Sequence, residues 1–510
     1  MSQERFYVTT AIDYANGEPH MGHAYEKVGA DVVARYHRLR DRQVHFVIGM
    51  DEHGLKVYQK AEESGVSPQA WVDGIAARFA ALWERLGISH DDFIRTTEPR
   101  HRAAVQEMVR RLEAAGDLYM GRYEGHYCVG CEAFKAEDEL EAVDGTSRCP
   151  IHPERELRWT AEENWFFRLS RYRDRLLALL EERPSFIQPE SRRNEIRRVL
   201  EGGLEDLSVS RATLPWGVPW PGDESHSVYV WIDALTNYLS AIGFPDEAYR
   251  EWWPADLHVI GKDITRFHCI YWPAMLMSAG LELPRSVWGH GFITVQGAKL
   301  SKSSGERLDL DALVERHGVD AFRYYLLRDV PWNGDGEFSL ERFDERYTSE
   351  LADNLGNLAN RVLSMVERYR DGTVPAAPAT DLDTAVAGAL VRYRAAMEAG
   401  LLHQGLAAAM ELAGTANGFV DQRAPWKQAK DPDQAAELDT TLGALVRALG
   451  ALATLLWPFM PARMEALMEG LNLPAPVLLD DVAELDLAGR TVSKPGVLFP
   501  KPERAPASEA

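Results

Sequence analysis

Two segments that lie far apart in the sequence carry side chains suited to binding a phosphate chain. In the first, His20 and His23 stand three residues apart around Gly22, between a strand-like run and a helical pattern. Free backbone N–H groups and the helix dipole at such a position favour an anion, and Gly22 leaves room for a flat ring. The pair predicts a phosphate site, although a surface cap or a chance spacing explains a lone pair of histidines equally well.

The second segment is a loop with two lysines, Lys299-Leu300-Ser301-Lys302-Ser303, which follows a turn at Gly297. Lysine is a compact cation that neutralises charge on a leaving pyrophosphate, and a loop can close over bound ATP. A solvated surface loop is the alternative for such a segment taken alone. The two segments together are more specific, because both predict contacts with one triphosphate.

A third group of residues has the spacing of a zinc site. Cys128 and Cys131 form one ligand pair, and Cys149 and His152 form another. Three thiolates and an imidazole complete a tetrahedral shell with no open position, so the metal is expected to be structural. An unmetallated reduced cluster is the alternative, and the remaining cysteine, Cys269, is expected to be a small buried residue.

Alternating strand and helix patterns position the histidines. Strand-like runs at residues 6–11 and 44–48 flank a helical pattern at about 23–39, which predicts a βαβ unit with a crevice at residues 12–23 and 49–54. The alternation dissolves into short segments between about 119 and 221. It returns with a strand at 257–260, a helix at about 264–279 and a strand near 286–294, so one nucleotide-binding fold is split by an insertion.

Strand signals vanish after Pro331, and helical patterns from 340 to about 470 predict a helix bundle. The fold class is therefore α/β, a Rossmann-like catalytic domain split by a zinc-binding insertion and followed by an all-α bundle. The expected divisions are residues 1–116 and 223–330 for the two halves of the catalytic domain, 117–222 for the insertion, 331–350 for a linking stem, 351–495 for the bundle and 496–510 for a tail.

Composition narrows the class of protein further. The chain has 510 residues, of which 45% are hydrophobic and 26% charged, as in a folded multidomain protein. Its net charge of −22 argues against nonspecific nucleic-acid binding, so such a partner needs local basic surface. The arginines at 192–193 and 197–198 are one candidate, or a solvated helix face. No signal peptide fits before residue 6, and Arg447 and Pro458 interrupt the apolar stretch 442–460, so a cytoplasmic protein without a membrane span is expected.

The paired motifs resemble the HIGH and KMSKS signatures of the class I aminoacyl-tRNA synthetases. They read His20-Met21-Gly22-His23 and Lys299-Leu300-Ser301-Lys302-Ser303, and Leu300 is an apolar exchange for the commoner methionine. Further segments resemble the methionyl-tRNA synthetases over essentially the whole chain; they are residues 14–17, 49–54, 229–234 and 261–268. Asp13 departs from the apolar residue or proline expected beside the pocket.

This resemblance implies roles for individual residues. The catalytic residues would be His20, His23, Lys299 and Lys302, and the ATP-binding residues Gly22, Gly261, Asp263, Ser301 and Ser303. The methionine pocket would comprise Ile12, Tyr14, Asp51, Trp231, Ala234, Leu235, Tyr238, Phe267 and His268. Asp51 can hold an α-ammonium, the rings favour a thioether, and Tyr14 and His268 are expected to make polar contacts with sulfur. Anticodon reading would fall to Asn357, Arg361, Pro425 and Trp426, although Trp426 fits a bundle core equally well.

The implied partners are ATP with Mg²⁺, L-methionine and the methionine tRNA with its CAU anticodon. One structural Zn²⁺ would lie in the insertion. A monomer is expected, because the chain ends soon after the bundle. The rival interpretations are a sister synthetase for isoleucine, valine, leucine or cysteine, a tRNA-binding scaffold without catalysis, and a simple nucleotidyltransferase. The short insertion argues against a sister enzyme with a long editing insertion, and the position of the zinc ligands in the insertion argues against the cysteine enzyme. The intact motifs argue against a scaffold, and the long bundle argues against a simple nucleotidyltransferase.

Overall fold

The first strand, helix and second strand form the predicted βαβ unit. In the computed structural model, β1 (Arg5–Thr10) is buried from its second residue onward and pairs in parallel with β3 (Gln43–Asp51), and α1 (Met21–Leu39) connects the two. Near-continuous burial of β1 is typical of a strand covered on both faces. The structure describes residues 3–128, 133–135, 140–143, 146–150, 153, 157–212, 214–295, 298–299 and 309–501.

The central sheet is parallel and has its switch point beside β1. Its order is β10 (Ile187–Gln188), β16 (Val287–His290), β15 (Leu257–Gly261), β1, β3 and β2 (Asp13–Tyr14), and β4 (Asp92–Arg95) also pairs with β3. The chain therefore builds the sheet to both sides of β1. In such sheets ligands bind in the crevice beyond the carboxyl ends of the strands at this point.

The segment expected as an insertion is more regular than its sequence indicates. Two long strands, β5 (Leu118–Cys128) and β9 (Arg158–Phe167), pair antiparallel in a sheet of order β11-β9-β5-β6. The expectation of short segments was wrong here, because charged and aromatic residues obscure the alternation on which strand recognition depends. One strand within 117–222, β10, belongs to the central sheet, so this range is not wholly outside the nucleotide-binding fold.

Smaller elements complete the catalytic half. Its further helices are α2 (Leu55–Glu63), α3 (Pro68–Arg85), α4 (Pro99–Ala114), α5 (Arg173–Glu182), α6 (Glu190–Gly202), α7 (Val230–Leu235), α8 (Asn237–Ser240) and α9 (Trp272–Ser278). Its further strands are β6 (Ala133–Lys135), β7 (Glu141–Val143), β8 (Thr146–Arg148), β11 (Leu207–Ser208), β12 (Ser210–Arg211), β13 (Pro219–Trp220), β14 (Asp223–Val228), β17 (Ile293–Val295) and β18 (Ala298–Lys299). The helix expected at 264–279 begins with a π-helical turn, Phe267–Tyr271.

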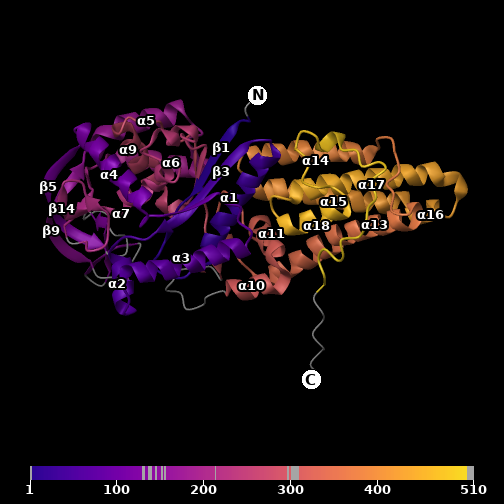
Figure 1. Cartoon of the computed structure of the whole chain (residues 1–510), viewed down its shortest axis with the longest axis horizontal. Coiled ribbons are helices and arrows are strands. Elements are labelled where there is room, and N and C mark those ends of the chain that lie inside the picture. The colour runs from indigo at the N-terminus through magenta and orange to yellow at the C-terminus, as the bar shows by residue number, and fades with distance from the viewer. Residues whose placement is uncertain are drawn as a thin grey trace, which may run out of the picture.

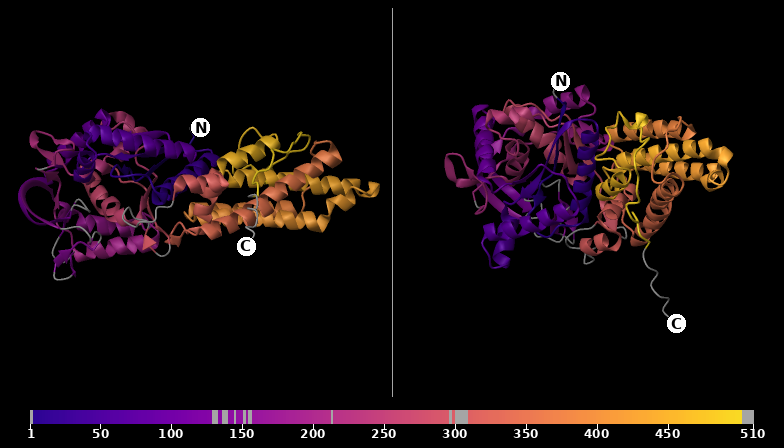
Figure 2. Two further views of the ribbon diagram at one scale, coloured as in Figure 1. Left: turned by 90° about the horizontal axis from the view of Figure 1, so that it is seen from below. Right: turned by 45° about the vertical axis from the view of Figure 1, so that its right-hand side comes forward.

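The second part of the molecule is the predicted helix bundle, which extends from one end of the catalytic half (Figures 1 and 2). A stem of α10 (Leu310–His317), α11 (Val319–Asp329) and α12 (Leu340–Arg346) leads through a π-helical stretch, Tyr347–Gly356, to the bundle helices. These are α13 (Asn357–Arg370), α14 (Asp381–Glu398), α15 (Leu402–Arg423), α16 (Pro425–Gln428), α17 (Ala435–Leu456) and α18 (Pro461–Gly470). Contrary to the expectation that strands end at Pro331, a two-residue strand, β19 (Gly336–Glu337), pairs with β17.

The apolar helix in the bundle is a core helix, as its interruptions indicated. One described helical segment, Pro432–Leu456, is long and apolar enough to cross a membrane, but 83% of its most apolar window is buried inside the protein. It includes α17, which packs against α13, α14, α15 and α18.

Candidate active site

His20 and His23 lie together at the N-terminus of α1, at the edge of the predicted crevice. Their rings stack with centroids 3.7 Å apart. The Nδ1 atom of His20 accepts a hydrogen bond from the amide of Gly22 at 3.1 Å, and Nδ1 of His23 accepts from the amide of His20 at 3.1 Å. A neutral imidazole that accepts at Nδ1 carries its proton on Nε2. Both rings are therefore set to donate from Nε2, as binding of phosphate oxygens requires.

The strand ends beside α1 bring Tyr14 and Asp51 together. Tyr14 of β2 is paired with Asp51 at the end of β3, and the amide of Ala15 donates to the Asp51 carbonyl at 2.8 Å. The Asp51 side chain is only 9% exposed, so a cation next to it would be screened little by water. Ile12 lies two residues before Tyr14, and a Cβ atom on Gly49 of β3 would come within 2.9 Å of its Cγ2.

A second group of candidate residues contains a slab of two stacked aromatic rings. The rings of Trp231, on α7, and Phe267 are nearly parallel at 6° and lie 3.6 Å apart. Trp231 also meets His268 edge to face at 6.4 Å. Ala234 and Leu235 follow Trp231 on the same helix and are buried. The structure thus brings residues from two distant predicted segments, 229–238 and 267–268, into one cluster.

His268 is held as a neutral ring by its two neighbours. Its Nδ1 is 3.0 Å from the carbonyl of Ile264, which can only accept, so Nδ1 carries the proton. Its Nε2 then accepts from the hydroxyl of Tyr238 at 2.6 Å. Burial lowers the pKa of His268 to about 4, because the charged form is poorly solvated there. Since both ring nitrogens are engaged, the contact expected between His268 and a sulfur atom has no N–H to make it in this arrangement.

Gly261 and Asp263 lie where β15 ends. A Cβ atom on Gly261 would come within 2.8 Å of Oδ1 of Asp263, so a larger residue here would displace this carboxylate. Asp263 is exposed, and its carboxylate is therefore accessible to a hydroxyl-bearing ligand. The ammonium of the neighbouring Lys262 forms an ion pair with Asp335 at 2.6 Å.

Two predicted groups lie wholly or partly outside the described residues. In the lysine loop, Ser301, Lys302 and Ser303 lie outside the described residues, and only the backbone of Lys299 is described, as part of β18. Of the zinc ligands, Cys131 and His152 are outside, whereas Cys128 and Cys149 are both fully buried. Within the described ranges, no group of three or more potential metal ligands is found.

Two of the residues expected to read an anticodon, Arg361 and Trp426, meet at the end of the bundle that carries α16 (Figure 1). The guanidinium of Arg361 lies 5.7 Å from the ring of Trp426 and pairs with Asp421 at 2.9 Å. Asn357 is exposed one helical turn before Arg361 on α13. Ala424 adopts a left-handed conformation that ends α15, and Pro425 then begins α16 with Trp426 37% exposed. Trp426 is therefore not a core residue.

Comparison with known proteins agrees with this geometry. The family described as tRNA synthetases class I (M) matches residues 6–363, and the anticodon binding domain of methionyl tRNA ligase matches residues 371–508. The chain belongs to the methionyl-tRNA synthetase family. It is 44% identical to the methionine–tRNA ligase of Streptomyces coelicolor over 99% of this chain and 98% of that one. It is also 44% identical to the Mesorhizobium japonicum enzyme, over 99% and 97%.

Solved structures of this synthetase family have the same fold. The Mycobacterium tuberculosis methionyl-tRNA synthetase in complex with methionyl-adenylate matches with a TM-score of 0.94 and 43% identity, over 98% of this chain and all of that one. The free form of that enzyme matches with a TM-score of 0.88 and 40% identity, over 99% of each chain. The chain is thus an aminoacyl-tRNA ligase for methionine.

One set of residues next to the candidate site residues escaped the sequence analysis. The carboxylate of Asp233 lies 2.6 Å from Nδ1 of His53 and 2.8 Å from Nε2 of His101, and it forms a hydrogen-bonded ion pair with each ring. All three side chains are buried. Burial alone would raise the pKa of Asp233, but the two imidazoles lower it to about 2. His53 follows Asp51 by two residues and Asp233 follows Trp231 by two, so this group joins the two segments that carry Asp51 and Trp231. Both residues lie in segments that carried the resemblance, but no local pattern pairs them.

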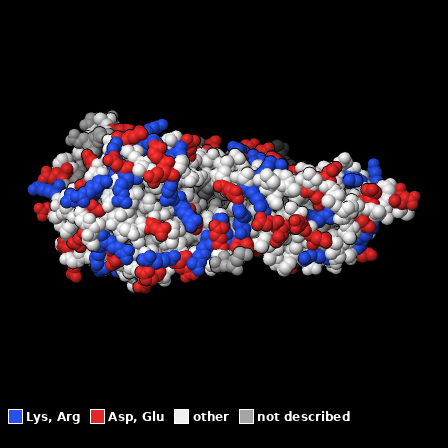
Figure 3. All heavy atoms as spheres, turned by 90° about the horizontal axis from the view of Figure 1, so that it is seen from above, with Lys and Arg blue, Asp and Glu red and all other residues white. Residues whose placement is uncertain are grey.

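The surface gives little support for a broad basic field. Figure 3 shows Lys and Arg interspersed with Asp and Glu over one face of the synthetase. On α6, Arg192 pairs with Glu195 at 2.7 Å and Arg193 with Glu190 at 3.0 Å, and Arg197 pairs with Glu181. These three of the four candidate arginines already neutralise nearby carboxylates.

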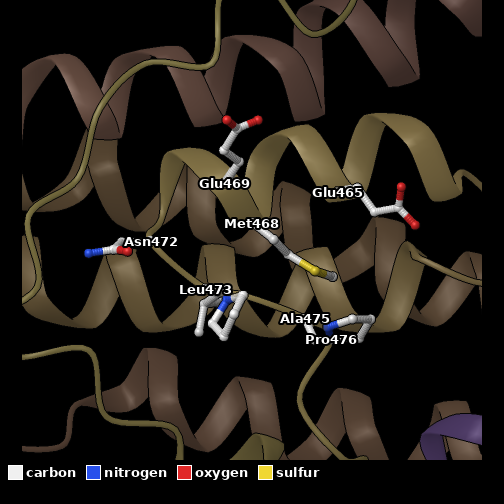
Figure 4. A pocket seen from close by; sticks show the side chains of 8 residues that line it. Glu465, Met468, Glu469, Asn472, Leu473, Ala475 and Pro476 are labelled. Atoms are coloured by element: carbon white, nitrogen blue, oxygen red, sulfur yellow. The ribbon is translucent and has the colours of Figure 1, made fainter.

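A hollow in the bundle lies apart from the catalytic residues. Met468 and Leu473 line it, together with Glu465 and Glu469 on α18 (Figure 4). Two carboxylates at its rim would repel a phosphate chain, and none of the predicted site residues lines it. It is therefore not the synthetase site.

Proposed function

We propose that the crevice beside β1 forms methionyl-adenylate with the residues assigned above. The methionine carboxylate attacks the α-phosphorus of ATP, the new C–O–P linkage forms and pyrophosphate leaves. Such a transfer requires mainly positioning and neutralisation of charge. The observation that carries the proposal is the pair of imidazoles, His20 and His23, each set to donate from Nε2 at a helix N-terminus. They would stabilise the oxygens of the α-phosphate.

The pocket residues are proposed to hold methionine by its two ends. The buried carboxylate of Asp51 would bind the α-ammonium, since a charge-assisted hydrogen bond is strong where water is excluded. The slab of Trp231 and Phe267 would take the thioether, whose polarizable sulfur favours aromatic rings. Ile12, Tyr14, Ala234 and Leu235 would close the apolar surface. Tyr238 and His268 form a hydrogen bond with each other and would close the end of the methionine pocket without donating a hydrogen bond to sulfur.

ATP is proposed to bind across the switch point. Gly22 would leave room for the adenine, Gly261 and Asp263 would seat the ribose, and the exposed Asp263 carboxylate would accept from its hydroxyls. Lys299 and Lys302, with Ser301 and Ser303, would hold the pyrophosphate side. Mg²⁺ bound with ATP would neutralise further phosphate charge.

The second step is proposed to pass the methionyl group to the methionine tRNA. The 2′-hydroxyl of its terminal adenosine attacks the adenylate carbonyl, and AMP leaves. The bundle would read the CAU anticodon, with Trp426 stacking on an unpaired base and Asn357 and Arg361 contacting base edges. The adjacency of Arg361 and Trp426 supports this role, and Pro425 fixes the start of α16 that carries the indole.

A structural zinc is proposed in the insertion. Cys128 closes the long strand β5 and Cys149 follows β8, and both thiols are buried, which suits ligands of a closed site. Cys131 and His152 would complete the shell. Metal analysis of the purified chain should find about one zinc, and its removal should lower the thermal stability of the insertion. We further propose that the chain acts as a monomer in the cytoplasm.

Methionine-dependent ATP–pyrophosphate exchange, measured with all twenty amino acids, tests the proposal. Methionine should give the fastest exchange. Replacement of His23 by Asn should reduce kcat about 100-fold, because one donor to the α-phosphate is lost. Lys430→Met, on the surface of the bundle, is a control that should leave exchange unchanged. Faster exchange with leucine or isoleucine would overturn the substrate, and an unchanged kcat in His23→Asn would overturn the role of the imidazoles.

A further inference from the structure

A lysine that takes no part in the roles above is buried directly behind the active site. Lys27 lies on α1, four residues after His23, and its side chain is 0% exposed. Its ammonium has three N–H donors, and three acceptors surround it. They are the Ala11 carbonyl at 2.9 Å, Oδ1 of Asp13 at 2.7 Å and Oε1 of Glu26 at 2.9 Å.

Two of these acceptors bracket a residue of the methionine pocket. Ala11 and Asp13 stand on either side of Ile12, and Tyr14 follows Asp13 in the sequence. The amide of Ala11 also donates to the carbonyl of Val259, which joins this segment to β15. Lys27 therefore fixes the pocket segment to the helix that carries the paired imidazoles.

The third acceptor extends the contact to the strand before the lysine loop. Glu26 is buried, and its second oxygen lies 3.1 Å from Nε2 of His290, the last residue of β16. The other ring nitrogen of His290, Nδ1, donates a hydrogen bond to the carbonyl of Gly291 at 2.7 Å. After His290 the chain continues through β17 to β18, which ends at Lys299. The network thus joins the pocket segment, α1 and the end of β16.

The charges in this network also act on the pocket itself. Burial alone would lower the pKa of Lys27, but the carboxylates of Asp13 and Glu26 raise it, so the ammonium stays charged. Burial raises the pKa of Tyr238, and the charge of Glu26 raises it further, which places Glu26 within electrostatic reach of the pocket. A buried ionic group is generally no more stabilising than apolar residues of the same volume. Its position between the pocket segment, α1 and β16 indicates a role in geometry.

We propose that Lys27 is a positioning residue for adenylate formation, which holds the pocket segment 11–14 in register with the imidazoles of α1. The role rests on the proposed function and adds a residue that touches no substrate. It also accounts for a charged residue at position 13, where the resemblance led us to expect an apolar residue or proline, because Asp13 supplies one of the two carboxylates that keep Lys27 in place.

Three variants separate positioning from simple charge compensation. Lys27→Met leaves two buried carboxylates without their cation and should lower both Tm and kcat. Asp13→Asn with Lys27→Met removes one of these charges, so Tm should recover most of the loss. Because the double variant lacks the contacts of Lys27, its kcat for ATP–pyrophosphate exchange should stay about tenfold or more below that of the wild type. Its KM values for methionine and ATP should stay within about threefold, since small misplacements of reacting groups lower the rate more than they weaken binding. Lys60→Met is the matched control, because Lys60 is exposed and its ion pair with Glu63 lies at the surface.

Asp13→Ala provides a second test that does not depend on the folding of the double variant. It keeps the pair of Lys27 and Glu26, so Tm should stay near wild type while kcat falls about threefold or more. A wild-type kcat in either Asp13→Ala or the double variant would overturn the positioning role. Absence of methionine-dependent exchange in the wild-type chain would instead overturn the proposed function, so the two failures are distinguishable.

Discussion

The catalytic half and the helical bundle bury different kinds of side chain. Among the described residues, the buried charged residues all lie at or before Arg323, and the Asp329 side chain on the same helix is also 0% exposed. Between Leu340 and Lys501, the buried polar side chains of the described part are Gln428, Thr441 and Thr454, and the rest of the core is apolar. Arg361 of the bundle pairs with Asp421 at the surface, whereas Lys27 and Asp13 pair in the interior.

The difference follows from what each part has to hold. Buried ion pairs lose hydration and add little net stability, but breaking one leaves an uncompensated charge, which penalises any other arrangement strongly. Apolar packing is less directional. A site whose groups must keep a fixed geometry therefore gains from buried ion pairs. A bundle that presents Trp426 at its far end needs only apolar packing.

The largest effect should come from the buried arginine at the junction of the two parts. Arg323 of α11 donates to Asp31 at 2.6 Å, to Leu86, and to the carbonyls of Pro458 and Phe459 in the bundle. Figure 1 shows α11 beside α1 and the bundle. Arg323→Met should lower the free energy of unfolding by about 4 kcal/mol, because Asp31 loses a buried partner. Urea unfolding measures it, and a loss under 1 kcal/mol would contradict the comparison.

An apolar truncation in the bundle should cost somewhat less and leave the chemistry intact. Leu452 of α17 is 0% exposed. Leu452→Ala should lower the free energy of unfolding by about 3 kcal/mol through lost burial and the cavity it leaves. The kcat of ATP–pyrophosphate exchange should stay within about twofold of wild type. A large drop in kcat would show that the bundle core, too, sets the geometry of the site.

Acid should destabilise the catalytic half through its neutral histidines. The pKa of His268 is about 4 in the folded chain, below the ordinary 6.5, so the unfolded chain binds protons first as pH falls. The stability from His268 is therefore complete above about pH 6.5 and is lost progressively down to pH 4, by about 2 to 3 kcal/mol. His268→Asn should lose less stability over that window in pH-dependent urea unfolding. An identical slope in both proteins would refute the contribution.

The smallest effect should come from the exposed pair in the bundle. Arg361→Met removes the contact with Asp421, in which the side chains are 30% and 65% exposed. The free energy of unfolding should change by less than about 1 kcal/mol, because water screens such pairs. The same variant should raise KM for tRNA in aminoacylation, and its exchange kcat should be unchanged. A stability loss comparable with that of Arg323→Met would remove the contrast between the two parts.

Several features could be predicted from local sequence. The βαβ unit of β1, α1 and β3, the return of the α/β pattern near residue 257 and the helix bundle are confirmed. The stacking of His20 with His23 follows from their spacing at a helix start, and the burial of α17 follows from the interruptions in its apolar run. These features depend on hydrophobic periodicity and capping, which act over one or two turns of chain.

Other features were decided only when distant segments met. Nothing near Lys27 in the sequence shows that Ala11 and Asp13 surround it, and nothing near His268 shows that Tyr238 occupies its Nε2. The membership of β10 in the central sheet is of the same kind. The sequence by itself determined which elements form and which residues carry chemistry. The pairing of buried charges and ring nitrogens depended on the tertiary path of the chain, because burial and hydrogen bonding are set by contacts between remote residues.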